Sequence, residues 1–119
     1  MPYLIDTDWV IDLLASVPEA VQLLDRLAQD GIAISIITYM EAYQGVERSP
    51  HPEEAQNKLS ALLDSLPVVS LSPAVAQRCA RLRETLRKQG KRVNARSLDL
   101  IIAATALEYN LTLVTRNTE

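Results

Sequence analysis

The N-terminal stretch Tyr3-Leu4-Ile5-Asp6-Thr7-Asp8-Trp9-Val10-Ile11-Asp12 passes from an apolar run through carboxylates into an amphipathic pattern. Residues 3–5 predict a short buried strand, and the apolar residues from Trp9 onward repeat at helical spacing, with Asp8 placed to cap that helix. In an alternating α/β chain, ligands gather at the carboxyl end of the first strand. Asp6 is therefore predicted to form the first wall of an acidic, metal-binding pocket.

The length and composition of the chain indicate one compact domain. A sequence of 119 residues, 48% of them hydrophobic and only 3 of them glycine, is enough for one core, so we expect a single domain over residues 1–119. The single cysteine, Cys79, excludes an internal disulfide framework and a cysteine-rich zinc site. No apolar run approaches the roughly 20 residues that span a bilayer. We therefore expect a cytoplasmic protein with no membrane partner.

Strand and helix patterns alternate along the remaining chain. Further strands are expected at 32–37, 68–71 and 111–115, with helices beginning near residues 18, 38, 52, 73 and 97. Thr38 to Glu41 has the form of a capping box. The last helix is expected to pack through Leu98, Ile101, Ile102 and Leu107. Right-handed crossovers then give an α/β fold, a three-layer α/β/α sandwich around a mostly parallel sheet of four to five strands.

Four polar side chains are expected at one edge of this sheet. Asp6 and Glu41 follow successive parallel strands, Asp99 begins the helix before the fourth strand, and Asn117 comes just after that strand. Each acid alone has a structural explanation, as a cap or as a partner of a helix dipole. Together, however, they would repel one another unless a cation neutralised them. Oxygen ligands suit Mg²⁺ or Mn²⁺ and could serve phosphodiester chemistry.

Neighbouring residues have weaker predicted roles. Thr7 and Thr115 could orient the acids through hydrogen bonds, Asp8 supports the site at most, and Asp12 is expected to be a solvated helix residue. Between Arg78 and Arg96 the only acid is Glu84, and this basic segment is either a solvated helix face or a surface that attracts a polyanion. The candidate RNA-binding residues within it are Arg87, Lys88, Lys91, Arg92 and Arg96.

Four motifs resemble those of the PIN-domain ribonucleases, and in particular their VapC-type toxin branch. They lie in order along essentially the whole chain, and each is of low specificity alone. They are Leu4-Ile5-Asp6-Thr7-Asp8, Ser35-Ile36-Ile37-Thr38-Tyr39-Met40-Glu41-Ala42-Tyr43-Gln44-Gly45, Leu98-Asp99-Leu100-Ile101-Ile102-Ala103-Ala104-Thr105-Ala106 and Leu113-Val114-Thr115-Arg116-Asn117.

The resemblance implies a metal-dependent endoribonuclease, held inactive by a cognate antitoxin and commonly dimeric. It implies that Asp6, Glu41 and Asp99 are metal ligands, and that Asn117 occupies or adjoins a fourth acidic position. Many relatives have an Asp at or just beyond Asn117, so this departure puts a second metal site in doubt. We also expect that the chain, which stops at Glu119, lacks the short closing strand and tail of the family.

Two other functions remain open at this point. Asp6-x-Asp8 after a first strand also resembles the nucleophile motif of haloacid-dehalogenase-type phosphatases, although Trp9-Val10 follows where Gly-Thr is usual. Alternatively, the chain could be a catalytically inactive PIN fold that only binds another protein. The paired acidic motif that such phosphatases have near the end is missing, and the presence of Asp6, Glu41 and Asp99 together speaks against an inactive fold.

Overall fold

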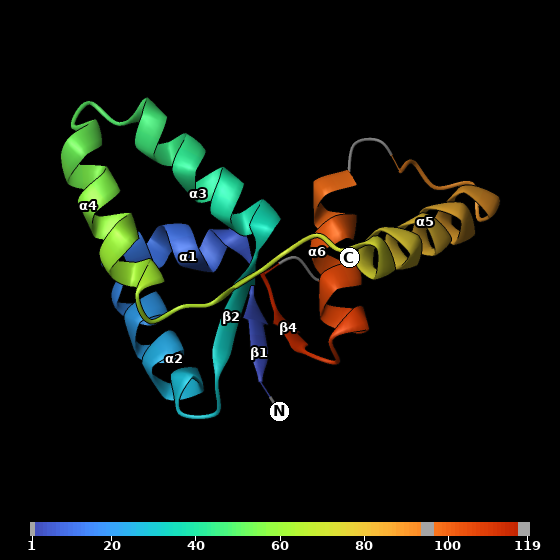
Figure 1. Cartoon of the computed structure of the whole chain (residues 1–119), viewed down its shortest axis with the longest axis horizontal. Helices are drawn as coiled ribbons and strands as arrows, with labels where there is room; N and C mark the ends of the chain where they lie inside the picture. The colour runs from blue at the N-terminus through green and yellow to red at the C-terminus, as the bar shows by residue number, and fades with distance from the viewer. Residues whose placement is uncertain (1, 94–96, 117–119) are drawn as a thin grey trace.

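The computed structural model describes residues 2–93 and 97–116, in which pairs of helices separate four successive strands (Figure 1). In chain order they are β1 (Tyr3–Ile5), α1 (Thr7–Leu14), α2 (Pro18–Ala28), β2 (Ile32–Ser35), α3 (Ile36–Arg48), α4 (Pro52–Leu63), β3 (Val68–Val69), α5 (Pro73–Lys88), α6 (Ser97–Glu108) and β4 (Thr112–Val114).

The strands form one sheet in the order β3-β2-β1-β4, and every pairing in it is parallel. Tyr3 of β1 lies opposite Ile32 of β2 on one side and Thr112 of β4 on the other. The expected α/β class and parallel sheet are confirmed. Because the strands are parallel, the segments that follow β1, β2 and β4 leave the sheet at the same edge.

Both faces of the sheet are covered, because successive strand residues belong to different core clusters. Ile5 and Ile34 pack with Val10 of α1, whereas Leu4 packs with Ile102 of α6. This alternation is the two-residue period of a strand, and it places helices on both sides. The predicted three-layer sandwich is therefore present, with α1 and α2 on one face and α6 on the other (Figure 1).

The strand expected at 32–37 is shorter than predicted. β2 ends at Ser35, and the Ser35 hydroxyl accepts a hydrogen bond from the Thr38 backbone N–H at 3.1 Å, which caps α3. The capping box expected at Thr38 to Glu41 is therefore wrong, since both residues lie inside the helix. A continuous apolar run cannot distinguish a strand from a buried helix start, and buried Ile37 belongs to the helix.

Two further expectations about apolar residues are wrong. Leu98 and Leu107 of α6 are 40% and 51% exposed, because α6 instead packs inward through its small residues and Ile102. The strand expected at 68–71 is only β3, and Leu71 beyond it is 46% exposed. Edge strands in sheets are often short.

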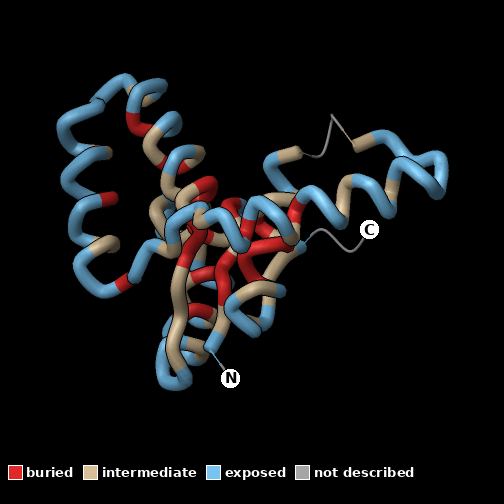
Figure 2. The backbone as a smooth tube through the Cα atoms, turned by 45° about the vertical axis from the view of Figure 1, so that its right-hand side comes forward, coloured by how far each residue is buried: buried red, intermediate tan, exposed pale blue. Residues whose placement is uncertain are grey.

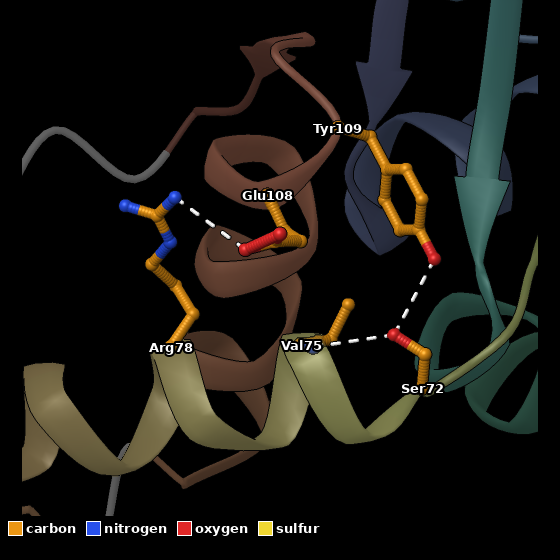
Figure 3. Close-up of polar contacts among 5 residues, drawn as sticks. All are labelled: Ser72, Val75, Arg78, Glu108 and Tyr109. Atoms are coloured by element: carbon orange, nitrogen blue, oxygen red, sulfur yellow. Dashed lines mark hydrogen bonds and ion pairs between the residues drawn. The ribbon is translucent and has the colours of Figure 1, made fainter.

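The helices α5 and α6 pack against each other, and α5 projects from the body of the molecule (Figure 1). Polar contacts join the start of α5 to the end of α6 (Figure 3). Ser72 caps α5 by accepting from the Val75 N–H at 3.2 Å, and the Tyr109 hydroxyl donates to Ser72 Oγ at 3.4 Å. Arg78 pairs with Glu108 at 3.4 Å. None of the described helices is long and apolar enough to cross a membrane.

Candidate functional site

Asp6 lies at the carboxyl end of β1 and is held through both of its side-chain oxygens. Its Oδ1 accepts a hydrogen bond from the Thr7 backbone N–H at 2.7 Å, and its Oδ2 accepts one from the Thr115 hydroxyl at 2.6 Å. Asp6 is therefore the N-cap of α1, and the assignment of that cap to Asp8 is wrong. Asp8 instead lies in the first turn of α1 and is exposed. A carboxylate at either position is favoured by the helix dipole.

Glu41 reaches the same region from the second turn of α3. The buried Thr7 hydroxyl donates to Glu41 Oε1 at 2.6 Å and lies 3.0 Å from the Thr38 hydroxyl. A hydroxyl has only one proton to donate, so the Thr38 hydroxyl must be the donor to Thr7. Ser35 in turn donates to Thr38 at 3.4 Å. A chain of three hydroxyls thus runs from the end of β2 to Glu41 and fixes the position of its carboxylate.

A pocket of about 270 Å³ opens between α1, α3 and the start of α6. Asp99 enters it from the first turn of α6 and is exposed. The convergence expected for Asp6, Glu41 and Asp99 is therefore present in the described structure. The full lining is Asp6, Thr7, Asp8, Ile11, Glu41, Gln44, Arg48 and Asp99.

The pocket offers oxygen donors in an open arrangement. Among residues 2–93 and 97–116, no three acidic, His or Cys side chains lie close enough to form a metal cage by themselves. The three acids nevertheless line one pocket together with Asp8, and Arg48 is the single basic side chain among its described lining residues. Mg²⁺ does not need a cage, because it keeps several waters and binds through one or two carboxylates together with substrate phosphate. The donor set therefore fits a water-rich Mg²⁺ or Mn²⁺ site.

The sequence model of the PIN-domain family matches residues 3–119 of this chain. The chain belongs to the PIN-domain family. Ribonuclease VapC2 of Rickettsia felis is 33% identical over 119 residues, which cover 98% of this PIN domain and 87% of the relative. The tRNA(fMet)-specific endonuclease VapC of Shigella flexneri is 29% identical over 118 residues, with 99% and 88% covered.

A solved structure is similar over the whole PIN domain. The crystal structure of VapBC2 from Rickettsia felis bound to a DNA fragment from its promoter contains a chain with 30% identity and a TM-score of 0.89. The match covers 100% of this PIN domain and 90% of that chain. The sequence resemblance to VapC-type PIN domains is thus confirmed by the fold.

The PIN domain also contains a clamp that the sequence did not reveal. The Arg116 guanidinium carbon lies 3.9 Å from the centre of the Trp9 ring, and Arg116 pairs with Asp12 at 2.5 Å. The sequence predicted that Asp12 is a solvated helix residue, and this is wrong, because Asp12 forms an ion pair. We call these three residues the Trp9–Asp12–Arg116 clamp. Because Arg116 directly follows Thr115, which donates to Asp6, the clamp connects Thr115 to helix α1.

Other predicted residues of the PIN domain lie away from the pocket or outside the described residues. Asn117 and Arg96 belong to the residues that the structure does not describe. Arg87 and Lys88 lie near the outer end of α5 and do not line the acidic pocket. Arg87 pairs with Glu84 on the same helix, and this hydrogen bond lowers the pKa of the Glu84 carboxyl. The remaining basic candidates, Lys91 and Arg92, follow α5 and are exposed.

Two polar lining residues, Gln44 and Arg48, were not predicted from the sequence. They follow Glu41 on α3 at offsets of three and seven residues, which places all three side chains along one side of the helix. This spacing is visible in the sequence once α3 is known to begin at Ile36.

Proposed function

We propose that this PIN domain is a metal-dependent endoribonuclease and the toxin of a toxin–antitoxin pair. The observation that carries the proposal is the pocket in which Asp6, Glu41 and Asp99 meet, with Thr7 and Thr115 holding two of the three. The names of the VapC relatives, a ribonuclease and a tRNA-specific endonuclease, support RNA as the substrate.

In this proposal Asp6, Glu41 and Asp99 hold Mg²⁺ or Mn²⁺, and Asn117 adjoins them. The cation would offset the repulsion between the acids and the RNA phosphate and stabilise the charge of the phosphodiester transition state. Thr7 and Thr115 orient the ligands, a task that hydrogen-bonding partners of metal ligands commonly perform. Asp8, in the first turn of α1, adds negative charge at the rim.

The hydrogen bonds leave one oxygen of Glu41 available. Thr7 occupies Oε1, and no donor among the described residues contacts Oε2. Oε2 can therefore bind the cation or accept a proton from an attacking water while Thr7 keeps the carboxylate in place. Asp6 is more constrained, since each of its oxygens already accepts one hydrogen bond. Each oxygen nevertheless keeps a further lone pair for a cation in the pocket that Asp6 lines.

We infer a cognate antitoxin and a homodimer as protein partners, because the similar solved structure is a VapBC assembly. The basic residues at and after the end of α5 would add RNA-binding charge outside the pocket. They are Arg87, Lys88, Lys91, Arg92 and Arg96.

The alternatives have less support in the geometry. A haloacid-dehalogenase-type phosphatase usually has Gly-Thr after its two acids, whereas here Trp9 and Val10 follow Asp8 inside helix α1. An inactive binding module would not need the hydroxyl chain from Ser35 to Glu41. The nuclease is the function that uses both the acids that meet in the pocket and the hydroxyl chain that holds Glu41.

Cleavage of structured RNAs with Mg²⁺, with Mn²⁺ and with excess EDTA tests the proposal. We expect cleavage with either metal, none in EDTA, and none above the EDTA background for Asp99→Asn. Asp25→Asn, an exposed acid on α2 outside the pocket, is the matched control and should cleave as the wild type does. Thermal unfolding of each variant shows whether it is folded. We expect no loss of stability in Asp99→Asn, because Asp99 is exposed. Full cleavage in EDTA would refute the metal mechanism.

A further inference from the structure

The acidic pocket contains one cation among its described lining residues, Arg48. Arg48 is in the last turn of α3 and is exposed. It forms no ion pair or side-chain hydrogen bond with any other residue in the described parts of the chain. Its five N–H donors are therefore open to a ligand in the pocket.

The lack of an ion pair is informative because of what surrounds Arg48. Four carboxylates, those of Asp6, Asp8, Glu41 and Asp99, line the same pocket. A purely structural arginine in such surroundings would be expected to pair with one of them. Arg48 instead forms an ion pair with none of them, so no described side chain pairs with its charge.

The distance along α3 sets what Arg48 can reach. Glu41 and Arg48 are separated by two helical turns, or about 10 Å along the axis at 1.5 Å per residue. Gln44 lies between them on the same side. The start of this helix is fixed, because Ser35 caps it and Thr7 bonds to Glu41. Glu41 and Arg48 thus lie two turns apart along one helix that lines the pocket.

We propose that Arg48 binds an RNA phosphate that flanks the scissile one and so places the scissile phosphodiester at the acids. The proposal rests on the proposed ribonuclease function and adds a substrate-positioning residue to it. Guanidinium and phosphate form paired hydrogen bonds, which a point charge cannot reproduce. The Gln44 side-chain amide lies between Glu41 and Arg48 along α3, so it can contact the sugar–phosphate backbone that joins the two phosphates.

The ordinary alternative is that Arg48 only stabilises the C-terminal end of its helix. Arg26 provides a matched control, since it is also an exposed arginine in the last turn of a helix, α2, but does not line the pocket. Any effect through the helix dipole should appear equally in Arg26→Gln and Arg48→Gln. An effect through phosphate should appear only in Arg48→Gln.

The test measures RNA binding by fluorescence anisotropy in Mg²⁺ across a salt series. The probe is a short fluorescent single-stranded RNA, and the protein is the full chain carrying Asp99→Asn, so that the probe stays intact. Arg48→Gln should weaken binding about 10-fold or more. It should also reduce the slope of log affinity against log salt by about 0.7, the value for one phosphate contact. Arg48→Lys should keep the slope but recover only part of the affinity, whereas Arg26→Gln should change neither quantity.

Cleavage kinetics on the otherwise wild-type chain give a second readout. Arg48→Gln should raise KM more than it lowers kcat, because its contact is made in the bound substrate as well as in the transition state. Equal binding and equal salt slopes for Arg48→Gln and Arg26→Gln would overturn the inference, whether or not the chain cleaves RNA. Wild-type binding without cleavage would refute the ribonuclease function alone, and the Arg48 comparison would still decide the inference.

Discussion

Thr7 is the residue through which the site is joined together. Its backbone N–H contacts Asp6, and its hydroxyl contacts both Glu41 and Thr38. It is only 8% exposed, so water cannot replace these bonds easily. Two of the three acids in the pocket thus depend on one residue, Asp6 through its backbone and Glu41 through its side chain.

Replacing Thr7 by Val removes the hydroxyl while nearly keeping the shape. We expect kcat to fall by about 10- to 100-fold, the usual cost of removing a group that orients a metal ligand. The loss of buried hydrogen bonds should also lower the free energy of unfolding by about 1–3 kcal/mol. Thr7→Ser, which keeps the hydroxyl, should recover most of the activity. Steady-state kinetics and urea unfolding check both, and an unchanged kcat in Thr7→Val would contradict the role.

The three acids of the pocket could be recognised from the sequence, but their local surroundings could not. Asp6, Glu41 and Asp99 follow from strand order alone, since parallel strands share an edge. The choice between Asp6 and Asp8 as a cap depends on where the helix turns, and both residue types suit the position. Arg48 was missed because its meaning depends on the absence of a partner, which only the folded structure shows.

At the scale of elements, the Trp9–Asp12–Arg116 clamp joins α1 to the segment after β4. The ion pair is partly exposed, with 40% of the Arg116 side chain and 27% of the Asp12 side chain accessible. Its direct contribution to stability is therefore small, about 1 kcal/mol or less. Because the clamp lies beside Thr115, which holds Asp6, we expect it to affect the orientation of Asp6 more than the stability of the fold.

Arg116→Gln should accordingly lower kcat by a larger factor than its loss of stability implies. We expect a several-fold loss of activity with a decrease of about 1 kcal/mol in the free energy of unfolding, from the ion pair and the contact with Trp9. Arg81→Gln, an exposed arginine on α5, serves as the control. If kcat stays at the wild-type value while stability falls, the clamp is structural only.

The contact between α5 and α6 encloses Cys79, the only cysteine of the chain. Burial raises the pKa of the Cys79 thiol, and the nearby Arg83 guanidinium offsets this only in part. The folded state therefore binds the thiol proton more tightly than the unfolded state does. This contribution to stability is fully present below the ordinary thiol pKa of about 8.5 and is lost as the pH rises through the higher pKa of the folded state.

We therefore expect the wild type to lose more stability between pH 8 and pH 10 than Cys79→Ala does. Urea unfolding at both pH values measures the difference, and comparing the pH dependence rather than the absolute values removes the cost of the small cavity. Iodoacetamide should also alkylate Cys79 slowly at pH 8 in the folded protein and rapidly in urea. Rapid alkylation of the folded protein would contradict the buried placement of the thiol.

The ends of elements divide into those that the sequence predicts well and those that it does not. β1, the start of α2 at Pro18 and the start of α5 behind Ser72-Pro73 agree with prediction, because proline and serine act through their own local geometry. The end of β2 does not agree. There the same apolar residues suit a strand and a buried helix, and tertiary packing makes the choice.

In the molecule as a whole, the acidic pocket and the basic residues of α5 lie on separate surfaces. The sheet edge reached from β1 and α3 carries the acids, whereas α5 projects from the body with a largely exposed outer half (Figure 2). The basic residues of α5 thus lie apart from the pocket. The sequence predicted the α/β/α layers from alternation alone, but not this separation, because it depends on the direction in which α5 leaves the sheet.

The order β3-β2-β1-β4 also determines when the site can exist during synthesis. β1 is an inner strand, and its partner β4 is synthesised more than a hundred residues later, since Asp6 and Thr115 are 109 residues apart. Contacts so distant along the chain form late, because the intervening chain loses conformational entropy before the contacts can stabilise the fold. The nascent polypeptide therefore carries Asp6 without its Thr115 hydrogen bond until β4 has been synthesised, so the acidic pocket cannot be complete before that point.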